Sequence, residues 1–119
     1  SNPSPSIGVN NEERPSFLRR IKTDLTLALA LVHHLAIGKN IPLDRIAYFF
    51  SGISNYLIIE FVPKEDEKVQ SMLSQKRIDY PHYNATDFES SFLHYFAIGK
   101  KEKIATSGRI LYLMTKKQP

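Results

Sequence analysis

The sequence predicts an α/β fold in which helices pack against a partly parallel sheet. The segment 25–31 (LTLALAL) is almost wholly apolar, and 56–62 (YLIIEFV) is a second apolar run, broken only by Glu60. Runs this apolar are typical of strands covered on both faces, so we expect helices above and below them. A helical pattern separates the two runs, whose first residues lie 31 positions apart (25 to 56). This length suits a strand–helix–strand unit with parallel strands.

Residues 1–23 are expected to form an irregular lead-in loop, and residues 24–119 a single α/β domain. Three prolines and a glycine interrupt the first fifteen residues, and these residue types favour turns and loops. Later in the lead-in, Phe17, Leu18 and Ile21 would lie on one side of a short helix over 16–22.

Three main helices are predicted. The first covers 42–52, because Pro42 suits the first helical position and Asp44 would lie in the first turn, near the positive end of the helix dipole. The second covers 66–77. The third starts at the pattern T-x-x-E formed by Thr86 and Glu89, which is typical of a capping box, and runs to about residue 96.

The chain is predicted to end in an antiparallel hairpin with strands at 98–104 and 109–115. The first strand is polar and basic, which suits the edge of a sheet, and the second (RILYLMT) is largely apolar. Only residues 105–108 separate the two strands, so a short turn joins them.

Composition narrows the function classes. There is no cysteine, which excludes disulfides, thiolate catalysis and cysteine-type zinc sites and suits a reducing compartment. No apolar run approaches the roughly 20 residues of a membrane span and the start is polar rather than signal-like, so we expect a cytoplasmic protein. The net charge is +4. This modest excess allows contact with nucleic acid through a basic face that includes Lys100, Lys101 and Lys103.

Three segments resemble the second half of a class I S-adenosylmethionine-dependent methyltransferase. DLTLALALVHHL (24–35) is similar to the fourth strand of these enzymes, YLIIEFVPKED (56–66) to the fifth strand and its exit, and LYLMTKK (111–117) to the last strand. NPSPSIG and NNEERPSF (2–8 and 10–17) resemble the loop between strands three and four in an uncharacterised bacterial branch of the family. The resemblance implies a partial Rossmann-like sheet whose last two strands form a hairpin.

The same resemblance implies methyl transfer by the parent protein to an unknown acceptor. Members of the family hold the cofactor in a glycine-rich turn, and here the glycines lie far apart, at Gly8, Gly38, Gly52, Gly99 and Gly108. We therefore expect the chain to be the carboxyl-terminal half of the domain, inactive alone and unable to bind S-adenosylmethionine tightly. The missing amino-terminal half would be its partner. Its absence would leave one edge of strand 25–31 unpaired, which predicts self-association across a two-fold axis.

The resemblance also places candidate residues. His33 and His34 follow the fourth strand, where a histidine can act as general base or orient a substrate. By the residues alone, one histidine could equally pack under the sheet while the other faces solvent. A metal site is disfavoured, because adjacent residues point in different directions and no third ligand has suitable spacing.

The resemblance also implies that Leu29, Ala30 and Leu31 contact S-adenosylmethionine. Their apolar side chains alone predict that these three residues lie in the core. Glu60 is an acid within an apolar strand, and it either is buried and paired or faces the substrate cleft as a catalytic residue.

Aromatic residues gather in the loop before the third helix, at Tyr80, His82 and Tyr83. They could stack on a flat substrate or simply cover a helix end. A stripe of phenylalanines four residues apart is predicted to lie in the core, at Phe88, Phe92 and Phe96.

A nucleic-acid-binding module without enzymatic activity is the alternative that the sequence leaves open. Strongly salt-dependent binding to generic RNA or DNA distinguishes it from the methyltransferase interpretation.

Overall fold

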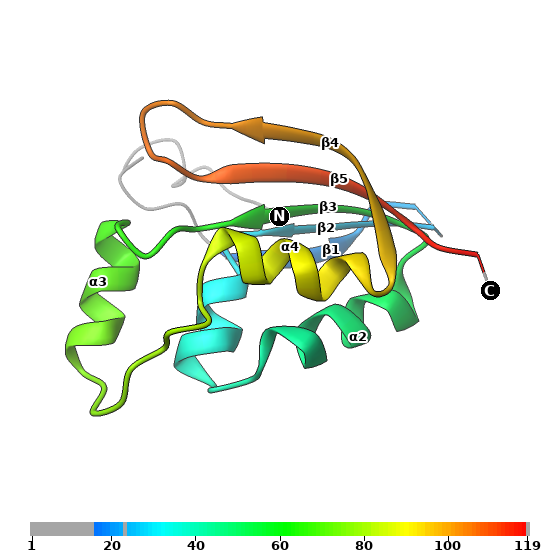
Figure 1. Cartoon of the computed structure of the whole chain (residues 1–119). Coiled ribbons are helices and arrows are strands. Elements are labelled where there is room, and N and C mark those ends of the chain that lie inside the picture. The colour runs from blue at the N-terminus through cyan, green and yellow to red at the C-terminus, as the bar shows by residue number, and fades with distance from the viewer. Residues whose placement is uncertain (1–15, 23, 119) are drawn as a thin grey trace.

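A computed structural model describes residues 16–22 and 24–118 as a mixed five-stranded sheet with helices packed on it (Figure 1). The strand order is β1–β2–β3–β5–β4. The strands are β1 (Phe17–Arg20), β2 (Leu25–Leu29), β3 (Tyr56–Phe61), β4 (Phe96–Lys103) and β5 (Ile110–Lys116), and the helices are η1 (His34–Gly38), α2 (Leu43–Ile53), α3 (Glu67–Ser74) and α4 (Ala85–Leu93).

The predicted parallel pair is confirmed. β2 and β3 run in the same direction, with Leu25 opposite Tyr56 and Ala28 opposite Ile59. Both strands are slightly shorter than predicted, because β2 ends at Leu29 and β3 at Phe61. α2 lies between β2 and β3 in the sequence and brings the chain back to the edge of the sheet where β2 begins. β3 can therefore run parallel to β2, as in other strand–helix–strand units.

The carboxyl-terminal hairpin is also confirmed. β4 and β5 are antiparallel, and β5 lies between β4 and β3 and pairs with both. The turn closes through hydrogen bonds from the Gly108 and Ile104 amides, with Gly108 at φ +75°. A left-handed residue at this place is a usual role for glycine.

The expectation of an irregular or helical segment is wrong for residues 17–20. They form β1, which pairs antiparallel to β2 with Phe17 opposite Leu29. The edge of β2 that was expected to be unpaired is therefore occupied, and self-association through that edge loses its physical basis. The rest of the expected lead-in, residues 1–15 and 23, lies outside the described residues.

η1, α2 and α4 cover one face of the sheet and lie below the strands in Figure 1, whereas α3 lies beyond one end of the strands, at the left. Side chains on that face are buried, and among them are Thr26, Ala28, Leu57, Ile59, Phe61, Tyr112 and Met114. On the opposite face the apolar side chains are only half-buried or exposed, and they include Leu25, Leu27, Ile58, Leu111 and Leu113. Within the described residues, the expectation of helices on both faces is therefore wrong.

An aromatic cluster joins α4 to the sheet. Phe88, Phe92 and Phe96 are fully buried, as predicted, and the ring centroids of Phe88 and Phe92 lie 4.6 Å apart. Phe96 does not end the helix, however, because α4 stops at Leu93 and Phe96 begins β4. The three rings pack together because they fill the space between helix and sheet, whatever the element that carries them.

Helix termini depart from the expected residues in two places. Asn84, not Thr86, caps α4, since its side chain accepts a hydrogen bond from the Asp87 amide at 2.7 Å. α3 ends at Ser74, earlier than expected. After β2 the chain forms one turn of π-helix, η1, in which the Lys39 amide bonds to the His34 carbonyl at 2.9 Å.

Candidate functional site at the carboxyl ends of the parallel strands

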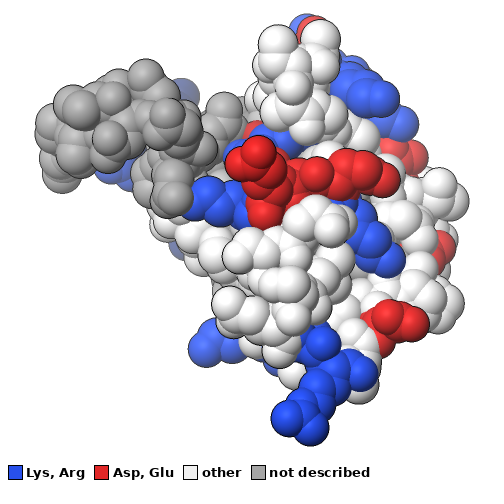
Figure 2. All heavy atoms as spheres, turned by 90° about the vertical axis from the view of Figure 1, so that its left-hand side faces the viewer, with Lys and Arg blue, Asp and Glu red and all other residues white. Residues whose placement is uncertain are grey.

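Polar side chains meet where β2 and β3 end. We name His33, Glu60, Asp66 and Arg109 the strand-end cluster; they come from the segment after β2, from β3, from the N-cap of α3 and from the residue directly before β5. Figure 2 looks onto the end of the molecule that α3 occupies, where acidic and basic side chains gather. The carboxyl ends of parallel strands are where α/β sheets bind ligands.

Glu60 holds the end of β2. Its Oε1 accepts a hydrogen bond from the Ala30 amide at 2.9 Å, and the carboxylate is fully buried. Ala30 has a φ of +50°, a left-handed conformation that costs a residue with a Cβ about 1–2 kcal/mol. A strained residue directly after a strand is typical of functional sites, where surrounding contacts maintain the strain. Here the Glu60 carboxylate is one such contact.

Arg109 lies between two acids. One of its terminal nitrogens is 3.8 Å from Glu60 Oε1, and its Nε and Nη2 donate to Asp66 Oδ2 at 3.1 and 3.0 Å. The other Asp66 oxygen caps α3 by accepting from the Lys68 amide at 2.8 Å. Asp66 therefore fixes the helix and the arginine at once. Charged hydrogen bonds shielded from water are stronger than exposed ones.

Within the strand-end cluster, His33 has a buried ring nitrogen that makes no hydrogen bond to the described residues. It is 2% exposed, and its Nδ1 has no hydrogen-bond partner among the described residues. Burial, helped by the neighbouring charges of His34 and Arg109, lowers the pKa of His33 to about 4. The ring is therefore neutral near pH 7. It can accept a hydrogen bond, but so low a pKa makes it a weak general base.

The two histidines take the split arrangement that was one of the sequence alternatives. His33 is buried and His34 is exposed, with their ring centroids 4.3 Å apart. Of the predicted cofactor positions, Ala30 is buried and both Leu29 and Leu31 are half-buried. The structure thus brings His33, Glu60 and Ala30 to one strand end, and it leaves His34 on the surface.

Asp66 and Arg109 belong to the site and were missed by sequence reasoning. A signal existed for Asp66, because an aspartate directly before an amphipathic run is a common N-cap. None existed for Arg109, which reaches Asp66 across 43 positions of the chain. Tyr83 also lies close: its hydroxyl donates to the Val62 carbonyl, and burial, followed by the Asp66 charge, raises the pKa of that hydroxyl.

Within residues 16–22 and 24–118, none of the helices has both the length and the apolarity that a membrane span needs.

Comparison with known proteins shows that the chain is similar to nodulation protein NoeA of Rhizobium meliloti (strain 1021). The two are 41% identical over 111 residues, which are 93% of this chain and 23% of NoeA. The chain thus spans about a quarter of the length of the relative that it matches. No protein-family model matches the chain, and no solved structure does so.

Proposed function

We propose that this chain forms the carboxyl-terminal part of the sheet in an S-adenosylmethionine-dependent methyltransferase domain, with the acceptor still to be identified. The strand arrangement supports this, because a parallel pair joined through a helix is followed by an antiparallel hairpin. In the enzymes that the sequence resembles, the corresponding strands carry the end of the cofactor site. A catalytic function would then belong to the longer parent protein.

The observation that carries the proposal is the hydrogen bond from the Ala30 amide to Glu60. It fixes the strand end at which a cofactor would lie and holds Ala30 in its left-handed conformation. Glu60 would then act as a positioning residue rather than as a base, since its carboxylate is buried and already bonded. His33 would offer its unused Nδ1 to a bound group as a hydrogen-bond acceptor.

In this proposal the strand end would supply one wall of a cofactor site. Leu29 and Leu31 are half-buried and flank the strand end, so they can contact a ligand, whereas the Ala30 amide is occupied by Glu60. S-adenosylmethionine supplies an electrophilic methyl group, and the protein's task is to place the attacking atom in line with it. The remaining walls would come from other parts of the longer parent protein, which would have to meet a strand edge of β2 that β1 occupies here.

Two experiments test the proposal. Calorimetry of this chain with S-adenosylmethionine is expected to show no binding near micromolar concentration. The full-length parent protein is expected to transfer labelled methyl groups to one of pooled RNA, protein or small-molecule fractions, and the variant Leu31→Asp in that protein should weaken cofactor binding. Tyr48→Asp, at an exposed position on α2, is the matched control and should leave cofactor binding unchanged. A full-length protein that neither binds the cofactor nor transfers methyl groups overturns the proposal.

The nucleic-acid alternative has weaker support from the structure. Lys101 of the basic strand β4 is paired with Glu89 at 2.7 Å, and the exposed Glu102 follows it. The lysines of β4 therefore do not form an uninterrupted basic strip. Binding of this chain to generic RNA that weakens steeply with salt would favour the alternative.

A further inference from the structure

The face of the sheet opposite the helices carries an apolar surface that crosses three strands. Leu27 of β2 lies next to Ile58 of β3, and Ile58 lies opposite Leu113 of β5. We name these three residues the open-face row. Leu27 and Ile58 are half-buried, and Leu113 is 41% exposed. An exposed apolar patch that crosses several strands is typical of a surface that another element covers.

Further apolar side chains extend this surface along the strands. Alternation along each strand places them on the same face as the row, and they are Phe17, Leu25, Leu29, Tyr56 and Leu111. Phe17 and Tyr56 are 36% and 49% exposed. Residues that alternate with them, such as Ala28, Leu57 and Tyr112, are fully buried on the helical side. The sheet is thus apolar on both faces, but the described helices cover only one of them.

Cations lie at both ends of the open-face row. Arg19 of β1 pairs with Leu27 at one end. Lys100 of β4 pairs with Leu113 at the other end. Both cationic side chains are exposed, and in the part of the chain that the structure describes neither of them forms an ion pair. Although Glu102 lies on the same face, it belongs to the neighbouring row, so the open-face row itself presents an apolar centre between two cationic margins.

The dimensions of this surface suit one α-helix. Neighbouring strands lie about 4.8 Å apart, so the row spans roughly 10 Å, close to the diameter of a helix with its side chains. Along β2, the five residues from Leu25 to Leu29 extend over about 13 Å, which is the rise of roughly nine helical residues. A helix of this length lying along the strands would cover the apolar surface. Its two flanks would come within reach of the long side chains of Arg19 and Lys100.

The known relative has enough chain to supply such a helix. The region similar to this chain spans only 23% of NoeA, so most of that protein lies outside it. A second copy of this chain suits the face less well than a helix does. Two open faces laid against each other would set cationic margin against cationic margin, and like charges brought together disfavour association.

We propose that an acidic amphipathic helix of the longer parent protein packs on the open face of the sheet. Its apolar stripe would lie on Leu27, Ile58 and Leu113, and Asp or Glu residues on its two flanks would pair with Arg19 and Lys100. A sheet that is apolar on both faces is stable when both faces are covered. Such packing would serve the assembly of the domain whether or not the parent protein transfers methyl groups.

Cysteine labelling tests whether the face is covered. The 119-residue chain has no cysteine, so Leu113→Cys gives it a single thiol. A maleimide should label this thiol readily in this chain alone, and at least about tenfold more slowly in the full-length parent protein, where mass spectrometry resolves each site. Thr106→Cys, in the exposed hairpin turn, is the matched control and should react equally in both proteins. Thr115→Cys, exposed on the same face as Leu113, gives a second measurement if Leu113→Cys fails to fold.

Cross-linking identifies the element that covers the face. A carbodiimide joins a lysine amine to a carboxylate in direct contact with it. In the parent protein, Lys100 should therefore link to an Asp or Glu that lies outside this chain, in a segment with apolar residues at helical spacing.

Charge reversal tests the cationic margins. Arg19→Glu combined with Lys100→Glu should raise the labelling rate of Leu113→Cys in the parent protein about three- to tenfold, because like charges would then meet. Lys103→Glu reverses a charge on the other face of β4, and it should leave that rate unchanged. Far-UV circular dichroism of each variant separates an uncovered face from a lost fold.

Four results would overturn the inference. The first is equal labelling of Leu113→Cys in the two proteins. The second is slow labelling in this chain alone, which would mean that a second copy or another part of the chain covers the face; its dependence on protein concentration separates these two. The third is a Lys100 cross-link confined to acids of this chain. The fourth is a labelling rate that the double charge reversal changes no more than Lys103→Glu does.

Discussion

The Ala30 amide donates a 2.9 Å hydrogen bond to the buried Glu60 carboxylate and so ties the ends of two parallel strands together. Ala30 is left-handed at φ +50°, and Glu60 is fully buried beside Arg109. The contact joins a strained backbone to a buried charge, so both partners should be sensitive to substitution.

Glu60→Ala is expected to lower the free energy of unfolding by about 2–4 kcal/mol, because it removes a buried acceptor and leaves Arg109 with one acid instead of two. Glu60→Gln should cost less, since an amide oxygen can still accept from Ala30. Urea unfolding measures both. Glu102→Ala, at an exposed edge position, should stay within about 0.5 kcal/mol of the parent protein. Equal stability of Glu60→Ala and Glu102→Ala would contradict this account.

Substitutions at Ala30 should follow the demands of its left-handed backbone. Ala30→Val is expected to destabilise the protein by about 2 kcal/mol or more, because a β-branched side chain strongly disfavours positive φ. Ala30→Gly should remain within about 1 kcal/mol, since relief of strain offsets the greater freedom of the unfolded chain. Thermal and urea unfolding provide the measurement. Ala97→Val, on the exposed face of strand β4, is the matched control and should be nearly neutral.

His33 should make the stability of the protein depend on pH in the acidic range. Its folded-state pKa of about 4 lies below the ordinary value of 6.5, so its contribution is complete above pH 6.5 and is lost as the pH falls from 6.5 to 4. The loss should reach about 2–3 kcal/mol. His33→Gln should flatten this part of the stability profile, whereas His34→Gln should preserve most of it, because burial is a larger cause of the lowered His33 pKa than the His34 charge. An NMR titration of the His33 ring with a midpoint near 6.5 would contradict the prediction even if the variant failed to fold.

The structure places Asn84 at the N-cap of α4, whereas the sequence pattern predicts Thr86 there. Asn84→Ala is expected to cost about 1 kcal/mol, because the Asp87 amide loses its side-chain acceptor. Thr86→Ala should cost nothing or stabilise slightly, since Thr86 lies inside the helix and alanine is the better helix former. Urea unfolding of the two variants decides between the caps. A larger loss for Thr86→Ala would restore the capping-box interpretation.

Much of the fold could be read from local patterns. The apolar runs around Leu27 and Ile58 and the helical stripe between them predicted the parallel pair, and the short turn before Arg109 predicted the hairpin. β1 escaped prediction because Phe17–Arg20 contains two arginines and no alternation. It is a strand only because β2 offers an edge to pair with.

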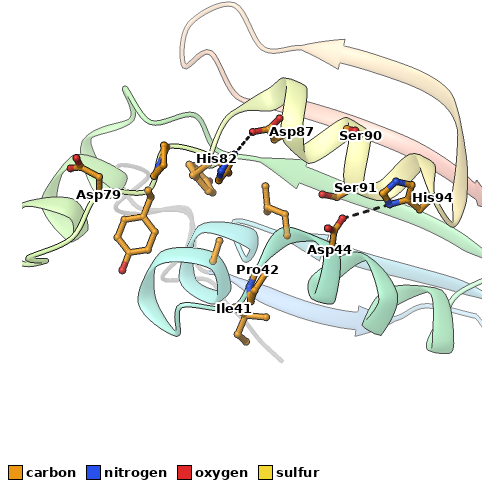
Figure 3. A pocket seen from close by; sticks show the side chains of 14 residues that line it. Ile41, Pro42, Asp44, Asp79, His82, Asp87, Ser90, Ser91 and His94 are labelled. Carbon is orange, nitrogen blue, oxygen red and sulfur yellow. Dashed lines mark hydrogen bonds and ion pairs between the residues drawn. The ribbon is translucent and has the colours of Figure 1, made fainter.

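Part of the candidate site was also readable. The sequence places Glu60 as an acid inside an apolar strand, and it allows one buried and one exposed histidine at His33 and His34. The partners of Glu60 could not be named, because Ala30 and Arg109 reach it only after strands and turns have docked. The same holds for the pairing of Asp44 on α2 with His94 at the end of α4 (Figure 3).

Apolar periodicity and turn residues act within a few residues, so they located four of the five strands and the three main helices from the sequence alone. Only the packed fold decided that β1 joins the sheet, that His33 rather than His34 is buried, and which charges pair at the strand end and between α2 and the end of α4. Those outcomes depend on how distant segments pack together. A contact between distant residues stabilises the fold only after the segments that carry them have packed together. No local sequence pattern therefore predicts it.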